Sequence, residues 1–275
     1  SVFCGHCEHC LTGHMSLCVE PETKRAAEEA PRLSHAGASV GQFANLGSFA
    51  EYMLVHEHAL VKIRPDMPLD RAALIGCGVM TGVGAVIHTA KVEPGATVAV
   101  IGCGGVGLSC INGAAIAGAS RVIAVDMVTS KLDLARKFGA TDVVNAREVN
   151  AIEAVKEITS GGVHYAFEAI GLKATAEQAF GMLRNGGVAT VIGMIPPGQM
   201  VSLHGADFLF EKRIQGSFMG SNRFRVDMPR FIELYLQGRL HLDDMVSGRI
   251  RLADINDAMA ALHTGEVARN VIVFD

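Results

Sequence analysis

Short apolar runs alternate with helix-patterned stretches through the middle of the chain, from residue 68 to about residue 217. Apolar runs of this length are typical of buried strands, whereas apolar residues spaced three and four positions apart are typical of amphipathic helices. The expected strands are 97–100, 122–125, 142–144, 165–169, 188–192 and 214–218, and the expected helices include 131–138, 151–159 and 174–183. Strands that alternate regularly with helices predict an α/β fold built on a doubly wound parallel sheet.

The two ends of the chain show a different pattern. Residues 1–67 combine a cysteine-rich lobe, a polar stretch at 20–38 and a strand-like run at 48–63. Beyond residue 220 the pattern predicts a helix at 228–237, a strand at 245–250, a helix at 253–263 and a strand at 270–274. We therefore expect two domains, in which the outer segments 1–78 and 219–275 form one unit around the middle segment 79–218.

The composition is that of a folded protein with a substantial core. Apolar residues make up 49% of the 275 residues and charged residues 19%, which excludes disorder and a small disulfide scaffold. The net charge of −4 carries no block of like charge, so we expect neither nucleic acid nor a membrane surface as a partner. The longest uncharged stretch, 94–120, contains seven glycines and predicts a strand, a turn and a helix, not a membrane span. Residues 1–18 lack the apolar core of a secretory signal, and we expect a cytoplasmic protein.

Four of the seven cysteines lie close together at the start of the chain, and these are Cys4, Cys7, Cys10 and Cys18. Cysteines two residues apart are well spaced to surround one tetrahedral ion, whereas disulfides between them would be strained. The alternative is two disulfides in a secreted protein, but a chain of 275 residues does not need them and three other cysteines would stay unpaired. Three interleaved histidines could offer substitute ligands, yet four thiolates already complete the shell. The lobe is therefore predicted to be a structural zinc site.

A glycine-rich loop follows the strand that begins at Thr97, with the sequence Gly102-Cys103-Gly104-Gly105-Val106-Gly107. The first glycine would form a tight turn, the second would let the backbone approach a pyrophosphate, and Gly107 would let the next helix pack on the strand. The N-terminus of that helix offers N–H groups and a positive dipole end to phosphates. The motif predicts a dinucleotide site in a Rossmann sheet; the alternative is a glycine-rich turn without a ligand.

An acidic residue stands where such a site needs one. Asp126 ends the second strand of the expected sheet, nineteen residues after Gly107. A carboxylate there would accept hydrogen bonds from the adenosine ribose and repel a 2′-phosphate, and no arginine follows it directly, so the sequence favours NAD over NADP. Ser130 and Asp133 predict a capping box at the start of the next helix, and Lys131 could also reach the ribose.

The cysteine lobe and the dinucleotide loop together resemble the zinc-containing alcohol dehydrogenases of the medium-chain dehydrogenase/reductase family, over essentially the whole chain. The lobe is similar to the family's structural zinc loop, and residues 76–82 resemble the segment whose cysteine, here Cys77, is a ligand of the catalytic zinc. Residues 216–221 resemble the segment whose backbone holds the nicotinamide amide, and Arg269 stands where the family has an arginine on the pyrophosphate. The resemblance implies that the outer unit is a GroES-like catalytic domain.

By this resemblance, the positions expected to contact the cofactor are Thr81, Gly102, Gly104, Gly105, Val106, Gly107, Asp126, Lys131, Ile170, Ile192, Gly193, Met194, Ser217, Met219 and Arg269. The resemblance also implies a zinc-bound alcohol that gives hydride to NAD, with zinc as a Lewis acid. The family's two other protein ligands of this zinc lie upstream of the cysteine lobe. Because Ser1 is not Met and two residues separate it from Cys4, we expect a catalytic domain that is incomplete at its N-terminus.

Two other histidines, His56 and His58, form an H-x-H pattern that could replace missing ligands, but we favour two solvent-facing imidazoles on an edge strand.

Clues to the substrate are few. The positions similar to the family's pocket are Phe43, Ala44, Met194 and Phe218, all of them apolar, which fits a primary alcohol or its aldehyde. Glu22 stands where the family branch that handles glutathione adducts has an arginine, which disfavours that branch. The alternatives are a zinc polyol or threonine dehydrogenase, or an inert protein that binds NAD and zinc. We expect a homodimer or homotetramer.

Overall fold

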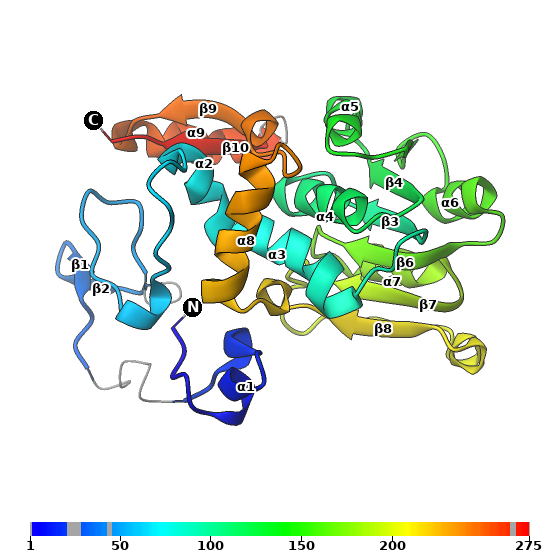
Figure 1. Ribbon diagram of the computed structural model, residues 1–275, viewed down its shortest axis with the longest axis horizontal. Helices are drawn as coiled ribbons and strands as arrows, with labels where there is room; N and C mark the ends of the chain where they lie inside the picture. The colour runs from blue at the N-terminus through cyan, green and yellow to red at the C-terminus, as the bar shows by residue number, and fades with distance from the viewer. Residues whose placement is uncertain (1, 21–28, 43–45, 265–267, 275) are drawn as a thin grey trace.

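The computed structural model describes residues 2–20, 29–42, 46–264 and 268–274, and its centre is a six-stranded sheet (Figure 1). The strands are β3 (Thr97–Ile101), β4 (Arg121–Asp126), β5 (Asp142–Asn145), β6 (Val163–Glu168), β7 (Leu183–Val191) and β8 (Arg213–Gly216). Their spatial order is β5-β4-β3-β6-β7-β8, and every neighbouring pair is parallel. The chain therefore winds outward from β3 in both directions, and the predicted doubly wound parallel sheet is confirmed.

Helices cover both faces of the sheet, which explains why its inner strands are almost continuously apolar. On β3, Val98 and Val100 belong to one hydrophobic core, whereas Ala99 and Ile101 belong to the other. The first core is covered by α4 (Gly105–Ile116) and α5 (Thr129–Lys137), and the second by α6 (Ala151–Thr159) and α7 (Lys173–Gly181).

A continuous helical segment, Leu69–Ala90, packs against α4 and is called the long helix below. It consists of α2 (Leu69–Leu74), the π-helical turn η5 (Ile75–Val79), α3 (Met80–Gly84) and the π-helical turn η6 (Ala85–Ala90). By length and composition alone it could cross a membrane, with 22 residues and a mean hydropathy of 1.6. Half of its apolar window is buried inside the protein, however, and Met80 and Val83 are fully buried in the first core, as in the core helix of a globular fold.

The outer segments form smaller elements around this centre (Figure 1). They are α1 (Glu8–Leu11), η1 (Met15–Leu17), β1 (Leu33–His35), β2 (Ala38–Val40), η4 (Glu57–Ala59), η8 (Met219–Ser221), α8 (Phe224–Leu236), η9 (Asp243–Met245), β9 (Val246–Ile250), η10 (Leu252–Asp254), α9 (Ile255–Thr264) and β10 (Arg269–Ile272). The short turn η7 (Gly205–Phe210) belongs to the middle segment and precedes β8. The cysteine lobe lies against the start of α8. The ring centroids of Phe3 and Phe224 are 6.4 Å apart, and a Cβ atom at Gly13 would lie 3.4 Å from Cδ of Arg223.

The prediction of a strand at 48–63 is wrong. Residues 48–63 contain the short turn η4 and otherwise extended or irregular chain, and Tyr52 and Leu54 are 91% and 73% exposed. The run has the apolar residues of a strand, but no described strand lies beside it to complete a hydrogen-bonded ladder. The expectation that His56 and His58 are solvent-facing residues on an edge strand is therefore wrong for His58. Its Nδ1 lies 2.6 Å from the carbonyl oxygen of Phe3, and its ring stacks on the Phe3 ring.

The expected capping box of Ser130 and Asp133 is also wrong. The helix begins at Thr129, and Oδ1 of Asp126 accepts the N–H groups of Met127 and Val128 at 2.8 and 3.0 Å. The carboxylate that ends β4 therefore organises the turn into the next helix. In the same way α8 begins at Phe224, earlier than the expected residue 228, since Oδ2 of Asp227 accepts the N–H of Arg223.

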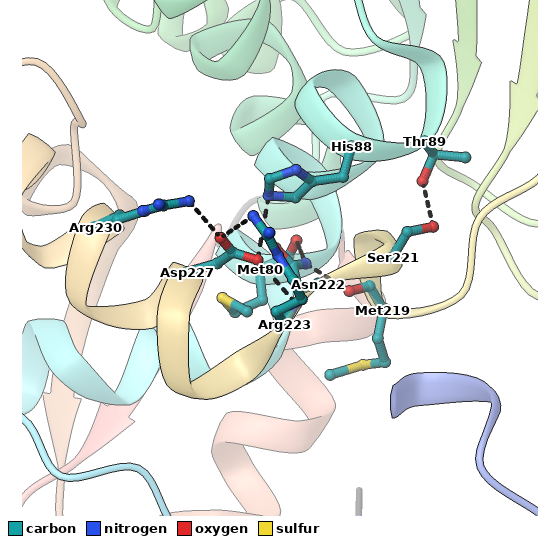
Figure 2. Close-up of polar contacts among 9 residues, drawn as sticks. All are labelled: Met80, His88, Thr89, Met219, Ser221, Asn222, Arg223, Asp227 and Arg230. Atoms are coloured by element: carbon teal, nitrogen blue, oxygen red, sulfur yellow. Dashed lines mark hydrogen bonds and ion pairs between the residues drawn. The ribbon is translucent and has the colours of Figure 1, made fainter. Parts of the chain in front are cut away.

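Asp227 lies where α8 meets the long helix (Figure 2). Its side chain is 1% exposed and forms ion pairs with Arg223 and Arg230, both at 3.4 Å, while Nε2 of His88 lies 3.4 Å from its other oxygen. Burial lowers the pKa of His88 below its ordinary value, and the two arginines add to this, although the carboxylate opposes them. Near neutral pH the buried charge of Asp227 is therefore balanced by arginines.

We predict that Asp227→Ala lowers the free energy of unfolding by about 2 to 3 kcal/mol, because it removes a buried charge partner and a helix cap together. Glu233→Ala is the matched control, since Glu233 lies on the same helix and pairs with Arg64, but its side chain is 52% exposed. This control should lose about 0 to 1 kcal/mol. Urea unfolding of both variants gives the comparison, and equal losses would show that the buried carboxylate of Asp227 stabilises the fold no more than an exposed ion pair does.

Candidate functional site

The four lobe cysteines bring their sulfur atoms within 4.8 Å of one another. The Sγ atoms of Cys4 and Cys10 are 3.8 Å apart, and those of Cys7 and Cys18 are 4.0 Å apart. Four thiolates at about 2.3 Å from one zinc ion would be roughly 3.8 Å apart at the corners of a tetrahedron, whereas a disulfide would bring two sulfurs to about 2.05 Å. The lobe therefore has the spacing of a zinc site, and all seven cysteines are free thiols.

The local backbone of the lobe favours a thiolate at Cys4. The N–H groups of His6 and Cys7 point at Sγ of Cys4, at 3.5 and 3.3 Å. Burial acts to raise the pKa of Cys4, but these donors and the neighbouring thiols bring it down to about 6. Burial raises the pKa of Cys10 to about 12. Because the four sulfurs cannot all ionise together without a cation, a bound divalent ion is what lets this set act as ligands.

The glycine loop has the geometry that its sequence predicts. Gly102 directly follows β3 and has φ +94°, a left-handed conformation that favours glycine. A Cβ atom at Gly107 would lie 1.7 Å from the carbonyl oxygen of Gly102, so this position tolerates no side chain. Nothing lies within 4 Å of a Cβ atom at Gly104, which leaves open space in front of the N-terminus of α4. The loop is a cradle that an anion fits.

Arg269 lies at the same helix N-terminus, although it comes from the far end of the chain. A Cβ atom at Gly105 would lie 2.5 Å from Cζ of the Arg269 guanidinium, and one at Gly78 would lie 3.6 Å from Nη2. The side chain also donates to the carbonyl oxygen of Ala268. A guanidinium, a helix N-terminus and a glycine backbone thus converge, as a pyrophosphate requires.

Asp126 lies at the tip of β4 beside this loop. Its Oδ2 accepts the N–H of Cys103 at 2.8 Å, while Oδ1 holds the turn into α5. The carboxylate is thus fixed in place by three backbone donors. Lys131 lies in the first turn of α5 and is half-buried.

Most of the other expected cofactor positions lie where β6, β7 and β8 end, at the same edge of the sheet. Ile170 packs over Gly102, and Gly193 approaches so closely that its Cβ atom would lie 2.1 Å from the nitrogen of Gly171. Ser217 shares a 2.8 Å hydroxyl hydrogen bond with Thr89. The remaining positions are Val106 in the first turn of α4, the buried Thr81 with Oγ1 3.8 Å from Sδ of Met219, the half-buried Ile192 and the 80% exposed Met194. Of the expected pocket residues, Phe218 is 58% exposed, whereas Phe43, Ala44 and also Glu22 lie outside the described residues.

Cys77 is exposed on the π-helical turn η5. Among the described residues, the lobe is the one cluster of three or more metal-binding side chains, so none forms around Cys77. His56 and His58 contact each other, and His58 also stacks on Phe3, so neither joins Cys77 in a metal cluster. The described residues thus bring one candidate ligand, and no catalytic step through a metal follows from this geometry.

Glu168 and Asn222 are two buried polar residues at this edge that no sequence pattern predicted. Oε1 of Glu168 accepts the N–H groups of Ile170 and Gly171 and the hydroxyl of Thr175, at 2.7 to 2.8 Å. The available signal was an acid that ends an apolar strand, the same signal that pointed to Asp126. Asn222 sits in a loop without such a signal.

Comparison with known proteins agrees with this geometry. A family model described as zinc-binding dehydrogenase matches residues 105–236, and the alcohol dehydrogenase GroES-like domain matches residues 1–66. Alcohol dehydrogenase 1 of Pisum sativum is 36% identical over 98% of this chain and 73% of its own length.

Two solved structures are similar in fold. Benzyl alcohol dehydrogenase from Acinetobacter calcoaceticus has a TM-score of 0.91 and 33% identity, over 99% of this chain and 75% of that one. A putative zinc-binding dehydrogenase from Sinorhizobium meliloti 1021, bound to NADP, has a TM-score of 0.81 and 25% identity, over 99% and 74% of the two chains.

We predict that Cys10→Ser releases one metal ion per chain, because the serine hydroxyl does not replace a thiolate in a four-sulfur site. Cys110→Ser is the matched control: Cys110 is equally buried, but lies on α4 outside the lobe. Metal content measured by native mass spectrometry should fall in the first variant and stay unchanged in the second. Unchanged zinc in Cys10→Ser would show that the four thiols do not form the site.

Proposed function

The chain belongs to the zinc-binding alcohol dehydrogenases of the medium-chain dehydrogenase/reductase family, and we propose for it the chemistry in which NAD rather than NADP interconverts a primary alcohol and its aldehyde, once the catalytic zinc has its full set of ligands. The observation that carries the cofactor proposal is the convergence of the glycine loop, Asp126 and Arg269 at one end of α4. The open space at Gly104 supports this proposal, because it leaves room for a pyrophosphate to approach the backbone of the loop.

The proposed division of labour follows the charges. Arg269 and the N-terminus of α4 bind the pyrophosphate, and Asp126 accepts hydrogen bonds from the adenosine ribose. The three backbone donors on Asp126 keep its oxygens fixed, so the carboxylate could not rotate away from a 2′-phosphate and would repel it. The similar dehydrogenase that binds NADP is 25% identical, so the choice of cofactor rests on this chain's own carboxylate.

The proposed substrate end lies beside Met194 and Phe218, both exposed at the ends of β7 and β8. Apolar side chains there favour a primary alcohol of aliphatic or aromatic character over a polyol or threonine. The similarity to a benzyl alcohol dehydrogenase supports the same choice. When bound, the family's catalytic zinc supplies a Lewis acid that favours the alkoxide. Cys77 would hold that zinc as one of its protein ligands.

We also propose that residues 1–78 and 219–275 form the catalytic unit around the dinucleotide-binding unit at 79–218, with the long helix continuous across residue 78. A homodimer or homotetramer is supported by the open edge of the sheet at β8. Leu209 and Phe210, directly before this strand, are 85% and 54% exposed. Seven free thiols fit a reducing compartment such as the cytoplasm.

We expect NADH to bind more tightly than NADPH, since a phosphate about 4 Å from a carboxylate costs roughly 1 to 4 kcal/mol. Asp126→Ser should lower the ratio of the NADPH dissociation constant to the NADH dissociation constant by about tenfold or more. Asp133→Ser, an exposed carboxylate on α5, is the control and should leave the ratio unchanged. Fluorescence titration measures both ratios, and equal affinities in the unmutated chain would remove the basis for NAD.

We further expect that these 275 residues bind NADH but do not oxidise benzyl alcohol, because Cys77 is their one family ligand for the catalytic zinc. The assay follows NADH formation from NAD and benzyl alcohol, with and without a chelator. A version extended upstream of Ser1 with the family's remaining ligands serves as the positive control. Chelator-sensitive turnover by the 275 residues at a comparable rate would show that other side chains, such as His56 and His58, complete the metal site.

A further inference from the structure

The turn between β8 and α8 has an unusual backbone. Three consecutive residues of η8 are left-handed: Met219 at φ +51°, Gly220 at +66° and Ser221 at +51°. Glycine adopts this conformation freely, but methionine and serine are strained in it. A strained turn persists only when its surroundings over-determine it, so the contacts that hold η8 are informative.

Asn222 makes the main contacts (Figure 2). The residue is fully buried, and its Nδ2 donates to the carbonyl oxygens of Met80 and Met219, both at 2.6 Å. One bond therefore closes the turn on itself, and the other ties it to the long helix. A second tie comes from Thr89, whose Oγ1 lies 2.8 Å from the hydroxyl oxygens of both Ser217 and Ser221.

The surroundings of Asn222 require this side chain and this orientation. Both acceptors are carbonyl oxygens, so the NH₂ group must face them, and the opposite oxygen, Oδ1, has no hydrogen-bond partner among the residues that the structure describes. A Cβ atom at Gly84 would lie 2.3 Å from Nδ2, and one at Gly220 would lie 2.3 Å from the carbonyl oxygen of Met80. The amide thus fills a space that two glycines leave open, and its function there is to donate twice.

We propose that Asn222 is the positioning residue for the nicotinamide: it holds the left-handed turn Met219–Ser221 in the shape that presents its peptide groups to the carboxamide. Asn222 does not itself touch the cofactor, because it is buried behind the turn, between η8 and the long helix. The inference rests on the proposed function and on the resemblance of residues 216–221 to the family segment that holds the nicotinamide amide. It adds the residue that fixes the turn, and the long helix as the support against which it is fixed.

The test separates the nicotinamide from the rest of the cofactor. NADH and ADP-ribose share the adenosine, the pyrophosphate and both riboses, but ADP-ribose lacks the nicotinamide. Asn222→Asp keeps the size of the side chain and removes both donors, and Asn222→Ala removes them without a charge. Asn112→Asp is the matched control, because Asn112 is also buried and bonds to the backbone of Arg239 and His241, away from the turn.

Dissociation constants are measured by calorimetry below the melting temperature of every variant, together with the fluorescence emission of bound NADH. Both Asn222 variants should raise the dissociation constant of NADH by about tenfold and change that of ADP-ribose by less than about twofold. They should also shift the emission of bound NADH toward that of free NADH. Asn112→Asp should lower the melting temperature without changing the ratio of the two constants. Equal changes for both ligands in the Asn222 variants, or no change for either, would overturn the positioning role.

If the unmutated chain binds neither ligand, the proposed function fails and the inference falls with it. If it binds ADP-ribose as tightly as NADH, the inference alone fails.

Discussion

Backbone packs directly on backbone where the long helix meets α4. A Cβ atom at Gly82 would lie 2.4 Å from the carbonyl oxygen of Val106, and one at Gly113 would lie 3.1 Å from Cα of Val83. Such an approach is available only to glycine, and it fixes the distance between the long helix and the dinucleotide loop. The loop, the turn η8 and α8 all take their positions from that contact, because each one packs on one of these two helices.

Groups from distant parts of the sequence meet at the carboxyl edge of the sheet. The glycine loop and Asp126 come from its first two strands, whereas Arg269 comes from the last strand of the chain. An arginine over a helix N-terminus is repelled by the positive dipole end, so it is held there by folding and not by local attraction. An anion between them would turn this repulsion into two attractions. Arg269 and the N-terminus of α4 together therefore favour a ligand with two negative charges, such as a pyrophosphate.

The sequence predicted what is encoded locally. The sheet strands are apolar runs, the glycine loop is a continuous motif, and the four cysteines lie within one lobe, so each could be recognised from neighbouring residues. The run at 48–63 has the same kind of pattern, but a strand also needs a neighbour, which no local pattern supplies. Asn222 was missed for the same reason: its acceptor on Met80 is 142 residues away. The capping of α5 was misassigned because Asp126 is both the end of a strand and the start of the next turn.

The contact between the cysteine lobe and α8 gives the lobe a second significance. Gly13 packs on Arg223, which is the residue after Asn222 and shares the carboxylate of Asp227. An oxidant that joined two lobe sulfurs would draw them from 3.8 Å to about 2.05 Å, displace the metal and shift the lobe from this contact. The disturbance would reach the turn η8 through one residue. If the turn positions the nicotinamide as proposed, oxidative damage to the lobe would first weaken the binding of that ring, in a protein whose sheet is still folded.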